Sequence, residues 1–384
     1  MSLIVEIKKK AQNLYTDYVR LSSIIPGFFQ ESSIGLNSIV IGDDAAVHIQ
    51  GLLNGGNKKI LWDLAVSLSD TLVVESNTKI KVLPGKGAVM RNVVNRPMFT
   101  NKNHVFSNNS DIIDHDIEID GGIWNGNSAG QTKKGTTQFG FNNLFSWYGV
   151  NNLVLKNHKM YTPKTYAQHA INVTNGHLSD FVVDVGPNPA INMDGVHWDG
   201  WCKDCSIKRG NIRSYDDGIG MNADDLLNVS GSEALGFFPV AANGPISNIT
   251  IEDIVFNDSL FGIRILSGQS RIDNISIKNI SGTTYNYSLL VDNFWQNPNN
   301  IDKPGKGNIG SVVADNITTT VPSKPVDFPI NRAKIVISGS IESLVMTNVT
   351  GSGTPLPQIL KLTQSSAGEY TYTYGSILLN GSPV

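Results

Sequence analysis

The sequence predicts an all-β fold, a right-handed parallel β-helix with a short N-terminal α-helix. Strand-like segments of the form apolar-x-apolar-x-x-apolar recur from about residue 150. Two series of such segments run out of phase and share a period of about 22–26 residues. Glycine and asparagine separate the segments, as is typical of turns between strands. This combination indicates a solenoid in which each coil contributes more than one strand.

Charge and composition exclude several classes of function. The 384-residue chain has a net charge of −3, and 16% of its residues are charged. Because no basic patch is evident, we expect no nucleic-acid partner. Because no run of 18 apolar residues occurs, we expect no membrane insertion. The N-terminal sequence MSLIVEIKKKAQ lacks the continuous apolar stretch of a signal peptide, so we expect synthesis in a cytoplasm without Sec export.

Residues 1–40 are expected to form an N-terminal helix and cap. Apolar residues here follow each other in steps of three and four, the a/d stripe of a heptad repeat. The stripe consists of Ile4, Ile7, Ala11, Leu14, Tyr18 and Leu21. Two interpretations stay open: a helix that covers the end of the larger domain, and a short coiled coil that joins identical chains.

Residues 41–350 are expected to form the β-helix, which a short helical pattern at 42–54 opens. The first series of strands begins at Leu153, Phe181, Cys205, Ile249 and Ile275, with steps of 28, 24, 44 and 26 residues. The second series consists of Val196, Ile219 and Ile263, with steps of 23 and 44 residues. Because 44 is twice 22, we interpret each long step as two coils.

Turns and the C-terminal end complete this prediction. One turn of the coil replaces the long crossover that parallel strands normally need. Turn asparagines tolerate left-handed φ values and can hydrogen-bond to their neighbours along the stack. Residues 351–384, which contain GEYTYTYGSILLNG, are expected to form a C-terminal β tail or cap.

Three aspartates are the candidate catalytic residues: Asp194 in NMDG, and Asp216 and Asp217 in YDDGIGMN. The step from Asp194 to Asp216 is 22 residues, one coil, which rises by about 4.8 Å. Carboxylates this close raise the pKa of at least one of them, which places an acid beside a base. Glycoside hydrolysis needs this division of labour. The alternative is that these are ordinary turn residues, as Asp224 nearby is expected to be.

Other side chains are candidates for substrate binding. Arg264, which the 44-residue step places over the same face two coils on, can hold a sugar carboxylate, sulfate or phosphate. Asn192, His197 and Trp198 flank the aspartates. Trp124 and Trp295 are further candidates for stacking on sugars, with plain packing as the open alternative.

No cofactor and no metal ion are expected. The two cysteines, Cys202 and Cys205, form a single CxxC, and a zinc site would need two more ligands. No second CxxC or HxxxH accompanies them. We therefore interpret them as two reduced thiols in a strand, with a redox or metal role as the alternative.

The motifs NMDG, DDGIGMN and GIRI resemble those of the polygalacturonase-like glycoside hydrolases (glycoside hydrolase family 28). The resemblance extends over roughly 40–350, and its phrase DGVHWDGWCKDCSIKRGNIRSYDDGIGMNADD is most similar to bacteriophage tailspike and appendage proteins with pectate-lyase-like coils. It implies that Asp216 is the general acid, that Asp194 and Asp217 activate water, and that the reaction inverts the anomeric centre. Arg264 would then contact the sugar next to the cleaved bond. The resemblance also implies a polysaccharide substrate, a homotrimer and a place on a virion tail, the alternatives being a cytoplasmic protein or non-Sec export.

Two family features are absent from the sequence. There is no GHG motif, and no histidine follows His197. Where the family has the lysine of RIK, this chain has Leu266. In the family that lysine and the arginine hold a galacturonate carboxylate together, so the reaction type is better supported than galacturonan as the substrate. A polysaccharide lyase and a non-catalytic receptor-binding protein on the same fold are the alternative functions.

Overall fold

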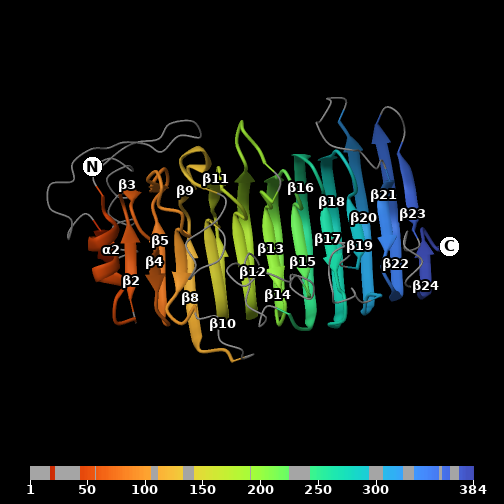
Figure 1. Ribbon diagram of the computed structural model, residues 1–384, viewed down its shortest axis with the longest axis horizontal. Helices are drawn as coiled ribbons and strands as arrows, with labels where there is room; N and C mark the ends of the chain where they lie inside the picture. Colours follow the sequence, from red (N-terminus) through yellow and green to blue (C-terminus); the bar gives the residue numbers. More distant parts are fainter. Residues whose placement is uncertain are drawn as a thin grey trace, which may run out of the picture.

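The computed structural model describes residues 18–21, 44–56, 58–104, 111–132, 142–190, 192–224, 243–293, 306–322, 333–353, 357–363 and 372–384. Within these ranges the chain coils into a right-handed parallel β-helix, as the sequence predicts. Figure 1 shows the strands of successive coils side by side along the long axis of the molecule.

The described part of the chain contains one α-helix, one 3-10 helix and a succession of short and long strands. The helices are α2 (Ala46–Leu53) and η2 (Ser128–Gly130). The strands are β1 (Val19–Arg20), β2 (Lys59–Trp62), β3 (Ala65–Leu68), β4 (Leu72–Val74), β5 (Thr78–Val82), β6 (Gly87–Met90), β7 (Phe99–Asn101), β8 (Asp114–Asp120), β9 (Ile123–Asn125), β10 (Phe145–Lys156), β11 (Lys159–Tyr161), β12 (Gln168–Asp184), β13 (Val196–Asp199), β14 (Lys203–Arg213), β15 (Ile219–Asn222), β16 (Ile246–Ser259), β17 (Ile263–Leu266), β18 (Ile272–Thr284), β19 (Leu289–Asp292), β20 (Ile309–Val321), β21 (Ala333–Ser338), β22 (Ile341–Gly353), β23 (Gln358–Leu362), β24 (Tyr374–Leu379) and β25 (Ser382–Pro383).

The strands stack into parallel ladders along the axis. The long strands β10, β12, β14, β16, β18, β20 and β22 pair in succession. A second ladder runs from β4 through β7 and the first residues of β10 and β12, and continues through β13, β15, β17, β19, β21 and β23. We call this second row the short-strand ladder, because it carries the candidate site.

The register of the short-strand ladder confirms the second series and corrects its spacing. Val196 pairs with Ile219, and Ile219 pairs directly with Ile263. The step of 44 residues is therefore one long coil, and the interpretation as two coils was wrong. Residues 225–242, which lengthen this coil, lie outside the described residues. An insertion between strands changes the spacing in the sequence without changing the register of the ladder.

The first series is correct in part. Cys205 pairs with Ile249 across the other 44-residue step, and Ile249 pairs with Ile275. Leu153, however, pairs with Gly176, five residues before Phe181. The sequence pattern missed this partner because a glycine gives no apolar signal.

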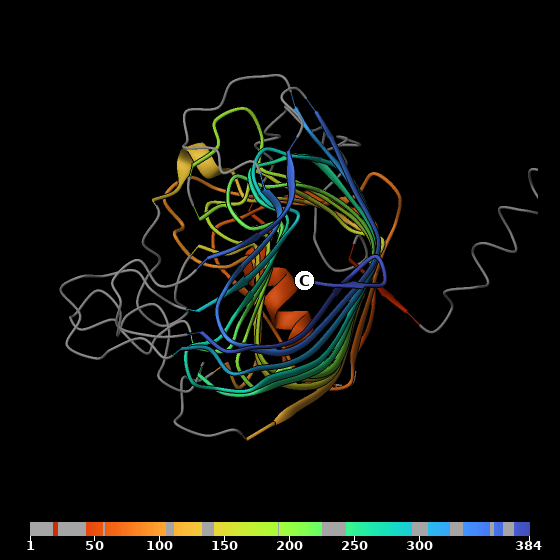
Figure 2. The same cartoon turned by 90° about the vertical axis from the view of Figure 1, so that its right-hand side faces the viewer.

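The interior of the solenoid is filled with stacked apolar side chains. Burying one large apolar side chain of this kind stabilises the folded state by about 1.5–3 kcal/mol relative to leaving it exposed. Helix α2 covers the N-terminal end and buries Ala46, Ile49 and Leu53, in agreement with the helix predicted at 42–54. Figure 2, which looks along the axis, shows α2 within the outline of the coils. Trp124 packs edge-on against Trp62, with ring centroids 5.3 Å apart.

Asparagines at the bends form ladders of their own, as expected. Asn248 and Asn274 adopt φ values of 57° and 54°. The Asn274 amide donates to Asn248 Oδ1 at 2.7 Å, and the Asn248 amide donates to Asp204 Oδ1 at 2.6 Å. The same sharp bend therefore repeats from coil to coil, which keeps the ladders in register.

The two ends differ from the predicted division of the chain. Most of the heptad stripe, up to residue 17, lies outside the described residues. The end of the stripe is not helical, because Val19–Arg20 form β1 and pair with β2. At the other end, parallel pairing passes residue 350: β23 and β24 continue the ladders of β21 and β22, and only the β24–β25 hairpin closes the end. No helix among the described residues is long and apolar enough to cross a membrane.

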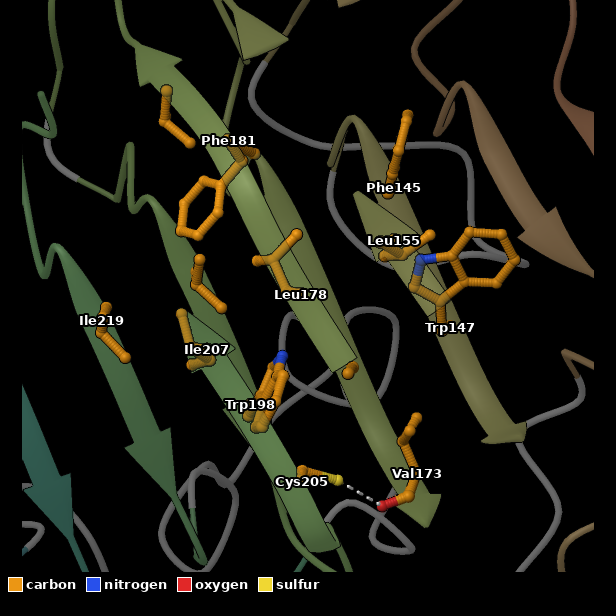
Figure 3. Packing of buried hydrophobic residues seen from close by; sticks show 14 of the residues in the cluster. Phe145, Trp147, Leu155, Val173, Leu178, Phe181, Trp198, Cys205, Ile207 and Ile219 are labelled. Carbon is orange, nitrogen blue, oxygen red and sulfur yellow. Dashed lines mark hydrogen bonds between the residues drawn. The ribbon is translucent and has the colours of Figure 1, made fainter. Parts of the chain in front are cut away.

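Cys202 and Cys205 are free and buried, in agreement with the two reduced thiols expected. Burial raises the pKa of the Cys205 thiol to about 12. Figure 3 shows this thiol within the apolar interior, where it donates a hydrogen bond to the Val173 carbonyl at 3.3 Å. Such a thiol stays protonated and unreactive at neutral pH.

Candidate active site

The short-strand ladder presents alternate side chains on the outer surface. Val196, Trp198, Ile219, Met221, Ile263, Ile265, Leu289 and Val291 belong to the hydrophobic core. Since successive side chains of a strand point to opposite faces, the residues between them point outward. These outward residues are His197, Asp199, Gly220, Asn222, Arg264, Leu266, Leu290 and Asp292.

Asp194 and Asp217 occupy neighbouring rungs, as the sequence predicts. Each lies two residues before the strand that follows it, and the Gly195 N–H donates to the Asp217 carbonyl at 3.0 Å. Gly220 lies beside both His197 and Asp217. A Cβ atom at Gly220 would be 3.2 Å from His197 Nδ1 and 3.7 Å from Asp217 Oδ2. A glycine here therefore leaves these polar groups room to face each other.

Asp194 is buried and held by His197. His197 Nδ1 lies 2.7 Å from Asp194 Oδ2, and its Nε2 lies 3.2 Å from Asp199 Oδ1. The Tyr166 ring stacks on the imidazole at 3.9 Å. Burial raises the pKa of Asp194 well above its usual value, against the opposing effect of the His197 hydrogen bond. His197, which is 2% exposed, thus orients Asp194 rather than reaching a substrate as expected.

Asp217 is also buried, between a tyrosine and an arginine. The Tyr287 hydroxyl donates to Asp217 Oδ1 at 2.7 Å, and Arg264 Nη1 lies 3.6 Å from Asp217 Oδ2. Burial raises the pKa of Asp217 to about 6, while Arg264 and the Tyr287 hydrogen bond act in the opposite direction. Asp217 is therefore protonated in weak acid and ionised at neutral pH.

Asp216 lies beside these two groups and is less buried. Its Oδ2 accepts a hydrogen bond from the Asn192 N–H at 2.8 Å. The negative charge of Asp216 contributes to the raised pKa of both Asp194 and Asp217. The charge of Asp216 therefore favours the protonated forms of Asp194 and Asp217. Asn192, a candidate for substrate binding, contributes its backbone to this group.

Arg264 is engaged by a carboxylate of the next coil. Its Nε and Nη2 lie 3.1 and 2.6 Å from Asp292 Oδ2. Asp292 Oδ1 also accepts a hydrogen bond from the Ser338 hydroxyl at 2.9 Å. Arg264 pairs in register with Gly220, one coil closer to the aspartates than the sequence spacing suggested.

The tryptophan candidates for sugar contact are wrong where the structure describes them. Trp198 points into the core, as Figure 3 shows, and its Nε1–H donates to Gln168 Oε1 at 2.8 Å. Trp124 is fully buried among aromatic rings. Neither can stack on a sugar at the outer surface, because alternation along the strand turns both inward. Trp295 lies outside the described residues.

Asp224 is a structural residue rather than an inert turn residue. It is fully buried, and its Oδ2 accepts hydrogen bonds from the N–H groups of Gly268, Gln269 and Ser270 at 2.6–2.9 Å. Removing this carboxylate would leave three backbone donors without their acceptor, which is costly in a buried position. A substitution at Asp224 is therefore no neutral control for substitutions of the candidate catalytic aspartates.

Tyr287 and Asp292 also belong to the site, although neither was predicted from the sequence. Tyr287 lies two residues before Leu289, the same offset that Asp194 has from Val196 and Asp217 from Ile219. Extending the second series by one coil to Leu289 would have revealed both residues. Among the described residues, no group of three or more histidines, cysteines or acidic residues is arranged to hold a metal ion.

The fold and the site together define a class of protein. A parallel β-helix with carboxyl groups on neighbouring rungs has the kind of groups that glycoside hydrolysis uses in pairs. The family model described as "Glycosyl hydrolases family 28" matches residues 67–364. The chain therefore belongs to glycoside hydrolase family 28, as its motifs indicated.

Solved structures resemble the chain in fold. A family 28 exopolygalacturonase of Yersinia enterocolitica has a TM-score of 0.54 at 12% identity; the match covers 96% of this chain and 79% of that one. A tailspike protein of Escherichia coli bacteriophage HK620, in complex with a pentasaccharide, has a TM-score of 0.54 at 11% identity; the match covers 92% of this chain and 60% of that one. No curated protein matches the sequence significantly.

Proposed function

We propose that this glycoside hydrolase is an endo-acting, inverting depolymerase of a bacterial surface polysaccharide. The observation that carries the proposal is the group of three carboxyl side chains, Asp194, Asp216 and Asp217, on neighbouring rungs of the short-strand ladder. Family membership supports hydrolysis.

In the proposed mechanism, Asp216 donates a proton to the glycosidic oxygen, and Asp217 with Asp194 holds the attacking water. The raised pKa of Asp217, about 6, suits a general base that works near neutral pH. His197 is a positioning residue, since it fixes Asp194 through a hydrogen bond of 2.7 Å. Attack by water on the face opposite the leaving oxygen inverts the anomeric centre.

The test uses a panel of purified capsular, O-antigen and wall polysaccharides. We expect one of them to be shortened rapidly, as size-exclusion chromatography would show, with new reducing ends whose first-formed anomer, seen by NMR, is inverted. An absorbance of unsaturated uronates in the product would instead favour a lyase. Binding of a polymer without shortening would favour a receptor-binding protein and contradict the proposal.

Tyr287→Phe should shift the pH dependence of hydrolysis. The Tyr287 hydroxyl lowers the pKa of Asp217 by hydrogen-bonding to its charged form. Without that bond the pKa rises further, so the acidic limb of kcat/KM should move up by about 0.5–1 pH unit. Tyr285→Phe is the matched control, because Tyr285 is similarly buried two residues away. An unchanged limb in Tyr287→Phe would exclude Asp217 as the titrating base.

We further propose that the protein acts as a homotrimer on a bacteriophage tail. The apolar residues Ile4, Ile7, Ala11 and Leu14 of the heptad stripe, which precede β1, and the resemblance to phage appendage proteins support this assembly, and the HK620 tailspike shares the fold. Light scattering of the intact chain should give about three times the chain mass of 41.6 kDa. A mass of one chain at micromolar concentration would contradict the proposal.

A further inference from the structure

The charge around Arg264 bears on which sugars the site can accept. In the described structure this guanidinium lies against Asp217 and Asp292, with closest distances of 3.6 and 2.6 Å. Asp292 is itself held by the Ser338 hydroxyl. Arg264 thus faces two carboxylates, and its side chain is only 17% exposed. The neighbouring outward position on the same strand is Leu266, which is uncharged and buried.

Binding of a sugar carboxylate beside Arg264 would be unfavourable. It would have to compete with Asp292 for the guanidinium, and displacing Asp292 would leave a partly buried carboxylate without its ion-pair partner. Breaking such a pair by removing one partner is unfavourable, because it leaves a poorly solvated charge uncompensated. The carboxyl groups of Asp194, Asp216 and Asp217 lie in the same site and add like-charge repulsion when ionised. An uncharged sugar has neither penalty.

We propose that the subsite at the cleaved bond accepts an uncharged sugar, and that Asp292 determines this specificity by occupying Arg264. This inference rests on the proposed hydrolase function and names its substrate class. The polymer can carry charges elsewhere along its repeat, but the residue beside Arg264 is neutral. Arg264 then acts on catalysis through Asp217, whose pKa it lowers.

The test measures binding without cleavage. The Asp216→Asn protein is run by affinity electrophoresis in gels that contain either polygalacturonate or the same polymer after reduction of its carboxyl groups. We expect the acidic polymer to retard the protein no more than the reduced one. Adding Asp292→Asn frees Arg264 and should increase affinity for the acidic polymer at least about tenfold, the scale of one charge-assisted hydrogen bond. Affinity for the reduced polymer should stay unchanged.

Two further variants test whether the gain in affinity for the acidic polymer comes from Arg264. Asp180→Asn makes the same charge change and also frees an arginine, since Asp180 pairs with Arg209 at 2.7 Å on the exposed surface. It should leave both affinities as they were. Adding Arg264→Gln to Asp292→Asn should abolish the gain. Circular dichroism of each variant checks that the β-helix is intact.

The proposal is overturned if the Asp216→Asn protein already binds the acidic polymer more tightly than the reduced one. It is equally overturned if Asp292→Asn brings no gain, including the case in which neither polymer retards any variant. These outcomes do not depend on bond cleavage, so they are distinct from a failure of the polysaccharide panel to reveal a hydrolase.

Discussion

Asp216→Asn is expected to lower turnover by at least about 10²-fold, the scale of general acid catalysis, while binding of the intact polymer survives. The amide keeps the shape of the side chain and can still accept the Asn192 N–H, which now lies 2.8 Å from Asp216 Oδ2. What it removes is the proton for the glycosidic oxygen. Single-turnover hydrolysis and equilibrium binding, measured on the polymer that the panel identifies, separate the two effects.

Asp253→Asn is the matched control for this substitution. Asp253 lies on an outer bend with φ of 58°, a conformation that asparagine also tolerates, and its Oδ1 accepts the Asn279 amide at 2.7 Å. We expect a near wild-type rate. If Asp216→Asn also hydrolyses at the wild-type rate with its fold intact, the proton comes from another group, and the family-based assignment of the acid is wrong.

The sequence was sufficient to predict the repeat but not the length of every coil. The spacing between Val196 and Ile219 correctly identified neighbouring coils, because no long insertion separates these two strands. The step to Ile263 was misread, since a chain can leave the ladder for any number of residues and return in register. Register is fixed by backbone hydrogen bonds and buried side chains, and the length of a surface loop does not affect either.

The candidate site was predictable where its residues lie on consecutive coils. Asp194 and Asp217 share an offset from their strands, so neighbouring rungs followed from the spacing alone. The direction of Trp198 was missed, although alternation from the inward Val196 would have placed it inside. The Arg264–Asp292 ion pair could not be predicted from the sequence. An ion pair across coils depends on side-chain geometry, which the spacing of motifs does not encode.

Asp217→Asn is expected to abolish most activity and at the same time to stabilise the protein at neutral pH. The loss should be at least about 10²-fold, because the amide cannot accept a proton from water. The expected gain in stability of the variant comes from the burial of Asp217 in the wild type, which raises the pKa of this side chain from 3.8 to about 6. The folded state therefore binds a proton more readily than the unfolded chain, so stability falls as the pH rises from about 4 to about 6, and the full cost is present at pH 7.

The neutral amide escapes this cost and can still accept the Tyr287 hydroxyl as a hydrogen-bond donor. The net shift of the Asp217 pKa, which already includes the attraction to Arg264 at 3.6 Å, sets an upper limit of about 3 kcal/mol on the gain. Calorimetry should show a higher unfolding temperature than wild type at about pH 7, and the difference should vanish by about pH 3, where Asp217 is protonated in both the folded and the unfolded chain. A lower unfolding temperature of the variant at neutral pH would contradict this prediction. It would mean that the attraction between Asp217 and Arg264 exceeds the desolvation cost of the buried carboxylate, so that ionised Asp217 stabilises the folded protein.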